Sequence, residues 1–475
     1  MSELKLSQTS TASMVRILSS HTVIPSAPTP SLTLPSSLCE QIKLSTHESL
    51  LYVYKSNIPR QDLQPHHILI TSLSQTLVPH YPLAGRLLCR SAAGGGRWEL
   101  HCNAKGARFY QAYCHSTLDD LDDFVSAQIV QELIPDIDYG CPIEQVPLLA
   151  VQLTRFSCGG LTIGLAMCRA VIDGIAAMRF INSWAKLARG ELLGSTEMPF
   201  NDRTALDSCA LNKTPRFEHS EFHPPPLWEG RGLEGSERET KTAVVVLKLT
   251  MDQVNKLKKK VGDSASPNKR PYSSFEVITG HVWRCVSKAR YAGNDDQPTR
   301  LSTVANCRNR LKPPLPSGYA GNVAFPTVTS TCSFHDLMHK PLNYAVGNVR
   351  EALERLTDEY VRSVLDYIER EKEVNAVRYN FYYPARSVYD GEFRGNPNLF
   401  VISWMNFSYR EADFGWGKPV YLDPGFMDSE GIAFVLDSAD GDGVVVAICL
   451  QAIHMDAFKR LFFEDIEGVF PTSKL

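Results

Sequence analysis

The fold is decided by the stretch Leu161-Thr-Ile-Gly-Leu-Ala-Met-Cys-Arg-Ala-Val-Ile-Asp-Gly174, which joins a run of uncharged residues to a helical pattern. Residues 161–167 carry no charge, which predicts a short buried strand. After Gly174 apolar residues recur every three positions, at Ile175, Met178, Ile181 and Trp184. This spacing predicts a helix that ends near Gly190. Residues 168–173 therefore form a tight connection between a strand and a helix, where side chains can point into a cleft.

The segments around this stretch predict a mixed α/β protein. Residues 147–155 form a second strand candidate, joined to residues 161–167 by a hairpin turn at Cys158-Gly-Gly160. Strands and helices alternate along the chain without an internal repeat, as in mixed α/β folds. In the C-terminal half we expect strands at 242–249, 301–305, 397–404, 431–436 and 443–450, and helices at 273–289, 344–371 and 455–463.

The regular patterns stop between about residue 191 and residue 240. Pro215, the run Pro224-Pro-Pro226 and the Gly- and Glu-rich residues 229–239 are typical of a long linker. We therefore expect an N-terminal domain at residues 1–195, a crossover linker at 196–240 and a C-terminal domain at 241–475.

Composition narrows the classes of protein. The chain has 475 residues, 43% hydrophobic and 21% charged, with a net charge of -3, so nothing favours binding to nucleic acid. We find no apolar run near the roughly 20 residues that a membrane span needs. The 12 cysteines include no Cys-x-x-Cys pair, and no zinc-binding spacing occurs. This pattern predicts reduced thiols, a cytoplasmic location and no metal.

Five motifs then appear in an order that resembles the BAHD family of plant acyl-CoA-dependent acyltransferases. They are Tyr81-Pro-Leu-Ala-Gly-Arg86, Asp173-Gly174 with the three residues before it, Gly280-His-Val-Trp-Arg284, residues 313–322 and Asp413-Phe-Gly-Trp-Gly417. The last is the most specific, because five fixed residues including a tryptophan rarely coincide. The resemblance covers nearly the whole chain. Residues 318–322 and 449–456 are most similar to the spermidine hydroxycinnamoyltransferase branch.

The resemblance implies two chloramphenicol-acetyltransferase-like domains with mixed sheets and a channel between them. Acyl-CoA would enter the channel as a co-substrate from one face and an amine or alcohol acceptor from the other, with no bound cofactor. In the family, a histidine four residues before the motif aspartate deprotonates the acceptor. Trp404 matches the tryptophan that steadies the oxyanion, and Asp173 matches the structural aspartate, paired here with Arg308 or Arg310. Ser273 and Ser274 match a stretch near the thioester.

Arg169 occupies the position of the family histidine. A general base needs a lone pair, which a guanidinium lacks, and loss of such a base typically costs about 10²–10⁴ in rate. Three interpretations are open. Arg169 binds a carboxylate or a forming oxyanion through its N–H fork; the chain is a catalytically silent binder; or acyl transfer persists through proximity alone.

Three neighbouring side chains need separate interpretation. Cys168 is next to Arg169, but adjacent residues of an extended segment point to opposite sides, so we expect a small buried residue. We expect His281 to be a core histidine. Ser408 replaces a proline common in the family and is expected to border the same cavity as Arg169.

The sequence thus predicts an enzyme of plant specialised metabolism on the BAHD scaffold. The family default is transfer of a hydroxycinnamoyl group from CoA to an amine, such as a polyamine, or to an alcohol. The alternatives are a lyase or cyclase acting on an anionic metabolite held by Arg169, and a binding pseudoenzyme. The expected partners are small molecules, without nucleic acid or membrane, and the family is usually monomeric.

Overall fold

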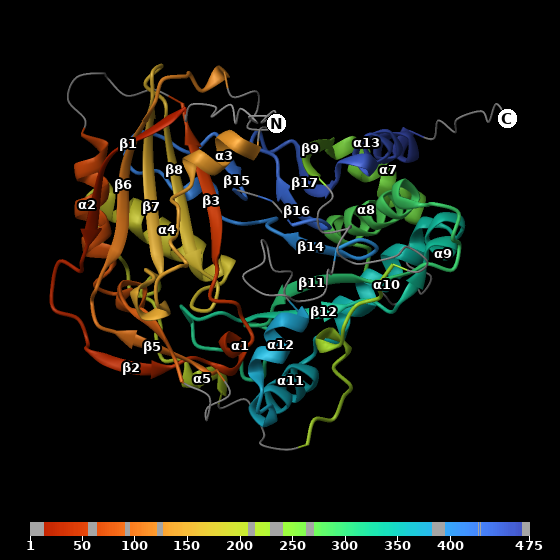
Figure 1. Ribbon diagram of the computed structural model, residues 1–475, viewed down its shortest axis with the longest axis horizontal. Coiled ribbons are helices and arrows are strands. Elements are labelled where there is room, and N and C mark those ends of the chain that lie inside the picture. The colour runs from red at the N-terminus through yellow and green to blue at the C-terminus, as the bar shows by residue number, and fades with distance from the viewer. Residues whose placement is uncertain are drawn as a thin grey trace, which may run out of the picture.

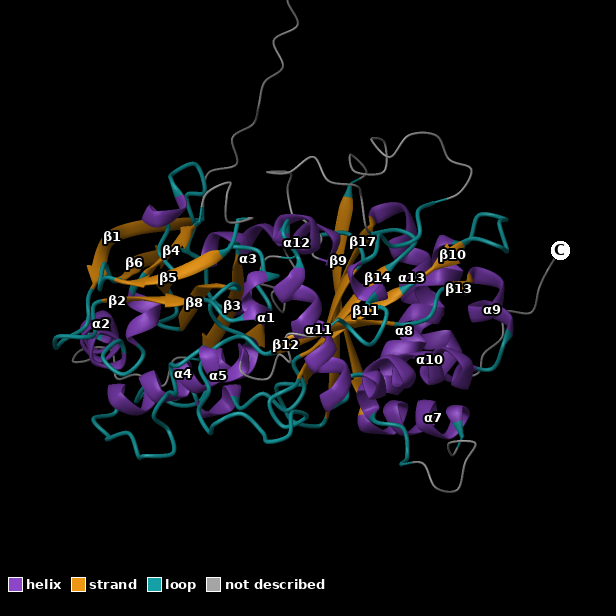
Figure 2. Ribbon diagram, turned by 90° about the horizontal axis from the view of Figure 1, so that it is seen from below, coloured by secondary structure: helices purple, strands orange, loops and turns teal. Residues whose placement is uncertain are grey.

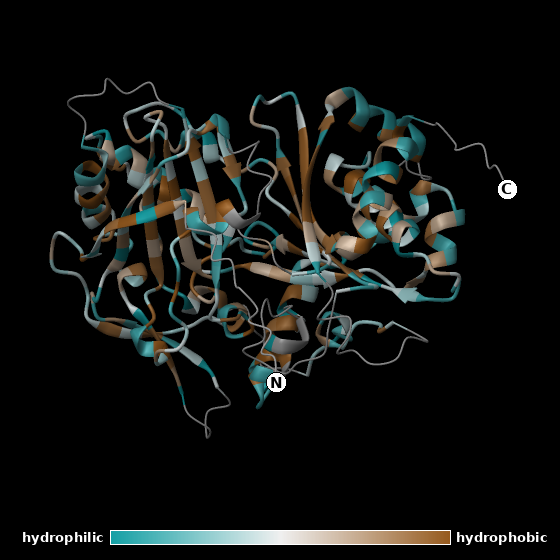
Figure 3. Cartoon of the chain, turned by 45° about the horizontal axis from the view of Figure 1, so that its top comes forward, coloured by the Kyte–Doolittle hydropathy of each residue, from teal (hydrophilic) through white to brown (hydrophobic). Residues whose placement is uncertain are grey.

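The computed structural model describes residues 14–55, 64–90, 96–120, 127–207, 214–228, 241–262, 270–381, 395–425, 427 and 429–467. Two six-stranded sheets lie side by side, one formed mostly by the N-terminal half and the other by the C-terminal half (Figure 1). Strands of both sheets are predominantly hydrophobic, whereas the helices around them carry hydrophilic residues as well (Figure 3). Two α/β units therefore pack against each other.

The first sheet has the strand order β1-β6-β7-β8-β3-β15. These strands are β1 (Val15–Val23), β6 (Ala107–Cys114), β7 (Leu149–Phe156), β8 (Leu161–Cys168), β3 (His47–Tyr54) and β15 (Tyr421–Asp423). Helices α2 (Pro65–Thr76) and α4 (Gly174–Ala188) pack together beside it, where the buried Trp184 indole donates a hydrogen bond to the carbonyl oxygen of Leu69. The predicted β7–β8 hairpin is confirmed, since the two strands pair antiparallel.

Smaller elements surround the first sheet. The strands β2 (Leu32–Pro35), β5 (Trp98–Cys102) and β4 (Arg86–Cys89) form a separate three-stranded sheet. The other α-helices among the described residues of this half are α1 (Leu38–Gln41), α3 (Ala127–Leu133) and α5 (Thr204–Asp207). Short 3₁₀ helices occur at Tyr81–Ala84, Ile143–Gln145, Ser220–Phe222 and Tyr409–Glu411.

The second sheet has the order β12-β11-β14-β16-β17-β9. Its strands are β12 (Ala324–Val328), β11 (Leu301–Asn306), β14 (Leu399–Ser403), β16 (Ile432–Asp437), β17 (Gly443–Gln451) and β9 (Thr242–Thr250). Figure 2 shows helices α7 (Met251–Val261), α8 (Ser274–Arg290), α10 (Leu342–Arg355) and α13 (Ala452–Glu467) on one side of this sheet. They share a hydrophobic cluster with its strands. Helices α9 (Phe334–His339), α11 (Asp358–Arg370) and α12 (Val374–Phe381) and the strand pair β10 (Pro298–Thr299) and β13 (Cys332–Ser333) complete this half.

The two halves interlock. Strand β15 comes from the C-terminal half but pairs antiparallel with β3 of the first sheet, with Leu422 opposite Tyr52. In the motif Asp413-Phe-Gly-Trp-Gly417, the aromatic rings of Phe414 and Trp416 are buried and make edge contacts with Tyr54. This motif therefore anchors the C-terminal half on the first sheet.

Two sequence expectations differ from the observed fold. The single helix expected at 344–371 is wrong: α10 ends at Arg355, and α11 begins after Thr357, whose hydroxyl accepts a hydrogen bond from the backbone N–H of Tyr360. A threonine cap stops one helix and starts the next without disturbing the apolar spacing. The expected linker at 196–240 contains α5 and a bridge from Phe200 to Tyr319; its residues 208–213 and 229–240 lie outside the described residues.

Candidate active site

The connection from β8 to α4 is built around Asp173 and Gly174. Asp173 has extended backbone angles and accepts a hydrogen bond from the N–H of Ala176 at 3.0 Å, so it caps α4. A Cβ atom on Gly174 would lie 2.6 Å from the ring of Phe407. Glycine is needed there because the start of α4 lies directly against a ring from the C-terminal half.

Both oxygens of Asp173 are fully engaged. Nη1 and Nη2 of Arg308 donate to them at 2.7 and 3.1 Å, and the N–H of Val323 donates at 2.8 Å. Burial alone would raise the pKa of Asp173, but Arg308 and these hydrogen bonds outweigh it and lower the pKa. Arg310 instead donates to backbone carbonyl oxygens, including that of Leu353 at 2.6 Å. Asp173 therefore has a structural role, and its partner is Arg308.

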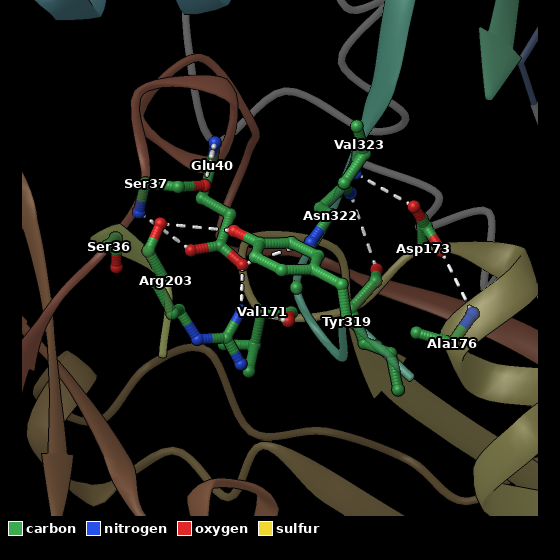
Figure 4. Close-up of polar contacts among 12 residues, drawn as sticks. Ser36, Ser37, Glu40, Val171, Asp173, Ala176, Arg203, Tyr319, Asn322 and Val323 are labelled. Atoms are coloured by element: carbon green, nitrogen blue, oxygen red, sulfur yellow. Dashed lines mark hydrogen bonds and ion pairs between the residues drawn. The ribbon is translucent and has the colours of Figure 1, made fainter. Parts of the chain in front are cut away.

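A second buried carboxylate, Glu40 of α1, holds the other side of the same loop (Figure 4). It forms an ion pair with Arg203, which also donates to the carbonyl oxygen of Val171 at 2.9 Å. Glu40 accepts a hydrogen bond from the N–H of Asn322 at 3.0 Å, and the amide of Asn322 donates to the carbonyl oxygen of Arg169 at 2.9 Å. The backbone of residues 169–173 is thus fixed from both halves of the chain.

A pocket opens beside this loop, between the two sheets. Its walls are largely apolar and come from both halves of the chain. The lining residues are Glu48, Leu50, Met167, Arg169, Ile172, Asp173, Gly174, Ala177, Val304, Asn322, Ala324, Phe400, Ile402, Trp404, Phe407 and Phe434. Among them only Glu48, Arg169 and Asp173 carry ionisable side chains.

Arg169 points into this pocket and contacts Glu48. On the antiparallel strands β3 and β8 Glu48 lies opposite Met167, so Arg169, two residues on, is its diagonal neighbour on the same face. Nη2 of Arg169 is 2.9 Å from Oε2 of Glu48, and the side chains are 25% and 29% exposed. Burial raises the pKa of Glu48, and Arg169 opposes this effect. Nε of Arg169 is buried and has no hydrogen-bond partner among the described residues.

Trp404 forms another part of the wall. It follows β14, and its N–H donates to the carbonyl oxygen of Val435 at 2.8 Å. Its ring stacks with Phe407 at a centroid distance of 6.0 Å and makes an edge contact with Phe434 at 4.9 Å. These contacts fix a large aromatic face in the same pocket as the guanidinium.

Comparison with known proteins identifies the family. The profile of the Transferase family matches residues 13–465. The chain is 40% identical, over 95% of its length and 100% of the relative's, to hydroxycinnamoyl-CoA:piscidic acid hydroxycinnamoyltransferase of Actaea racemosa. It is 37% identical, over 95% of its length and 99% of the relative's, to shikimate O-hydroxycinnamoyltransferase of Nicotiana tabacum. The chain belongs to the BAHD acyltransferases.

Solved structures agree with this fold. Vinorine synthase superposes with a TM-score of 0.67 at 22% identity, covering 93% of this chain and 96% of that one. TRI101 of F. graminearum, solved with coenzyme A and deoxynivalenol, superposes with a TM-score of 0.75 at 14% identity, covering 90% and 97%. The expected fold of two chloramphenicol-acetyltransferase-like domains is confirmed. This BAHD chain is an acyltransferase of plant specialised metabolism with acyl-CoA as co-substrate.

The other residues singled out in the sequence lie outside the pocket. Cys168 donates through its thiol to the carbonyl oxygen of Ser45, and burial raises the pKa of that thiol to about 12, so it is not a nucleophile. His281 is a core histidine whose Nε2 lies 2.9 Å from the carbonyl oxygen of Phe462. The expectation for Ser408 is wrong: its exposed hydroxyl contacts Asn182, and Phe407 lines the cavity instead.

Ser273 and Ser274 lie at the start of α8, away from the pocket lining. The hydroxyl of Ser273 accepts a hydrogen bond from the N–H of Glu276, whose carboxylate accepts one from the N–H of Ser273. This reciprocal arrangement is a capping box. Ser274 is the first residue of the helix and is partly exposed.

The sequence analysis missed Glu48. The signal was a charged residue shortly before the apolar and aromatic run Leu50-Leu-Tyr-Val-Tyr54, but only strand pairing shows that it faces Arg169. The adjacent His47 is excluded as a replacement base. Its Nε2 and Nδ1 lie 2.8 and 2.9 Å from the carbonyl oxygen of Pro147 and the hydroxyl of Tyr139, and burial lowers its pKa to about 4. Both ring nitrogens are occupied.

Among the described residues, no helix combines the length and the apolar character that crossing a membrane requires.

Proposed function

We propose that this enzyme transfers a hydroxycinnamoyl group from CoA to the hydroxyl or amino group of an acceptor that also carries a carboxylate, and that Arg169 binds this carboxylate. The observation that carries the proposal is the guanidinium of Arg169 in an apolar pocket, at the position of the family histidine. Of the described residues that line this pocket, Arg169 is the one cation.

The chemistry of a guanidinium favours such an acceptor. It presents five N–H donors in a planar fork that matches a carboxylate. One terminal nitrogen of Arg169, Nη2, contacts Glu48, and the side chain is 25% exposed, which leaves the N–H groups of the other terminal nitrogen, Nη1. In apolar surroundings a charge-assisted hydrogen bond is stronger than in water. Arg169 therefore has donors left for a second anion.

The names of relatives support the same acceptor class. The two relatives described above are named for piscidic acid and shikimate, and a third, 38% identical and from Avena sativa, for 5-hydroxyanthranilate. Piscidic acid is an acid by name, and the other two names denote carboxylates. All three are named as hydroxycinnamoyltransferases, which supports the proposed donor.

The remaining parts of the proposal concern the rest of the site. Trp404 steadies the oxyanion, and Ser273 and Ser274 contact CoA near its thioester, as the family resemblance implies. We expect a cytoplasmic, monomeric enzyme without nucleic-acid or membrane partners. A polyamine acceptor is the second candidate, favoured by the similarity of residues 318–322 and 449–456 to the spermidine branch.

The test compares acceptors that differ in one charge. Purified protein receives a hydroxycinnamoyl-CoA with shikimate, with its methyl ester or with spermidine, and CoA release is followed with a thiol reagent. We expect shikimate, as a probe, to be used better than its ester. Arg169→Gln should lower kcat/KM for the acid by about 10–100-fold, corresponding to about 1.5–3 kcal/mol for hydrogen bonds to a charged group. Turnover of the ester should fall by a smaller factor, because the ester lacks the carboxylate that Arg169 binds.

Equal use of acid and ester by the unaltered protein would contradict the proposal. A preference for spermidine would favour the polyamine candidate. Consumption of an anionic metabolite without release of CoA would favour the lyase or cyclase alternative, and binding without any turnover would favour the pseudoenzyme.

A further inference from the structure

Acyl transfer to a hydroxyl or amine requires a proton acceptor, and Arg169 cannot be one. Within the part of the chain that the structure describes, the pocket lining contains neither histidine nor lysine. Apart from Arg169, its ionisable groups are the carboxylates of Asp173 and Glu48. Asp173 and Glu48 are therefore the two candidates for the proton acceptor among these lining residues.

Asp173 is excluded by its contacts. Its two oxygens accept hydrogen bonds from Arg308 and from the backbone N–H groups of Ala176 and Val323. Its side chain is only 5% exposed. Taking up a proton would break a buried ion pair, which is costly. Asn322 is also committed, since its amide donates to the carbonyl oxygen of Arg169.

Glu48 is more exposed than Asp173 and has fewer polar contacts. Its side chain is 29% exposed, and among the described residues its carboxylate makes a single polar contact, the ion pair between Oε2 and Arg169. Leu50 lies two residues further along β3 and faces the same pocket, so the strand presents this carboxylate to the cavity. Oε1 remains available to a ligand. Because burial raises the pKa of Glu48, its carboxylate is a stronger base than one in water.

We propose that Glu48 is the catalytic proton acceptor of this enzyme, in place of the family histidine. This inference rests on the proposed function, because the acceptor occupies the same pocket. Arg169 and Glu48 then form one unit: the arginine positions the carboxylate and the acceptor, and the glutamate takes the proton.

The reaction balances with these groups. The acceptor oxygen forms a bond to the thioester carbonyl carbon while its proton passes to Glu48, and the carbonyl π electrons move to oxygen. The resulting anion is stabilised by the nearby positive charge of Arg169. The electron pair on this oxygen then re-forms the C=O bond as the C–S bond breaks, and the C–S electron pair leaves with the CoA sulfur, which takes the proton from Glu48. The products are an ester and CoA thiol, and Glu48 is a carboxylate again. An amine acceptor gives an amide by the same steps.

The test uses four proteins: the unaltered chain, Glu48→Gln, Arg169→His and the double variant. With hydroxycinnamoyl-CoA and the best acceptor from the panel, Glu48→Gln should lower kcat by about 10²–10⁴-fold, the usual contribution of a general base. KM of the acceptor should change by less than about threefold, and the loss of rate on acidification should disappear. The double variant returns an imidazole to the family position and should regain at least tenfold in kcat over Glu48→Gln.

A matched control is Glu191→Gln, which removes an exposed carboxylate that also pairs with an arginine, Arg189, at 2.6 Å. Its kcat should equal that of the unaltered protein. If Glu48→Gln does not fold, Glu48→Ala is assayed with added formate, which should restore turnover in proportion to its concentration.

A kcat for Glu48→Gln within threefold of the unaltered protein would overturn the inference, and so would a rise in acceptor KM alone, which indicates a binding role. Failure of the proposed function has a different signature, because acid and ester are then used equally while Glu48→Gln is still slow. Absence of CoA release by the unaltered protein with every acceptor overturns both.

Discussion

Two carboxylate–arginine pairs lie at opposite ends of one loop, and they differ in burial and in hydrogen bonding. Asp173 and Arg308 are 5% and 10% exposed, and further hydrogen bonds satisfy the carboxylate. Glu48 and Arg169 are 29% and 25% exposed and meet through one close N···O contact inside a pocket. A saturated buried pair fixes the backbone, whereas a partly exposed pair with unused donors and acceptors is available for substrate.

The largest effect of a substitution on stability is expected at the buried pair of Asp173 and Arg308. Asp173→Ala leaves the guanidinium of Arg308 buried without its counter-ion and removes the cap of α4. We expect a loss of about 3–5 kcal/mol in the free energy of unfolding, measured with urea. Asp440→Ala is the control for an exposed carboxylate, which pairs with Lys248 and accepts hydrogen bonds within a surface turn, and its loss should be much smaller than that of Asp173→Ala. A loss below about 1 kcal/mol for Asp173→Ala would show that the pair does not hold the fold.

The pH dependence of stability should separate the two carboxylates by sign. Arg308 and hydrogen bonds lower the pKa of Asp173 despite its burial, so its stabilisation is present above the unfolded value of about 3.9 and is lost as pH falls through the folded pKa. Burial raises the pKa of Glu48 despite Arg169, so its contribution is present below about 4.3 and is lost as pH rises through the folded pKa.

Urea unfolding between about pH 3 and pH 8 measures this difference. Relative to the unaltered protein, Asp173→Asn should lose stability as pH rises to about 5 and then stay level, whereas Glu48→Gln should gain stability as pH rises above about 4.3. A parallel response of the two variants would mean that both carboxylates serve the fold in the same way, and would remove the contrast between the pairs.

Local patterns predicted most of the elements near the site. The strand at 161–167, the helix after Gly174 and the position of Arg169 on the connection depend on residues close together in the chain, where spacing and capping act. The break between α10 and α11 was missed because the apolar spacing continues across Thr357.

Long-range pairing could not be predicted in the same way. Glu48 faces Arg169 because β3 pairs with β8 in one register, and a shift of one residue would turn it to the other face of the sheet. The addition of β15 to β3 joins residues more than 350 positions apart and has no local signal. The family resemblance left two candidate partners for Asp173, namely Arg308 and Arg310. The structure decides between them, because Nη1 of Arg308 donates a hydrogen bond to Asp173.

The smallest effects are expected for substitutions of the two serines at the start of α8. Kinetics and stability together can distinguish a ligand-binding role from a structural role there. If Ser273 and Ser274 both contact CoA, as proposed, replacing either by alanine raises KM for acyl-CoA. Ser273→Ala should in addition lower the free energy of unfolding by about 1 kcal/mol, because the N–H of Glu276 loses its acceptor. Steady-state kinetics and urea unfolding of both variants provide the measurement, with Ser333→Ala, which caps α9, as the control for a cap alone. An unchanged KM in both variants would leave Ser273 with the role of a helix cap and move the CoA contact elsewhere in the channel.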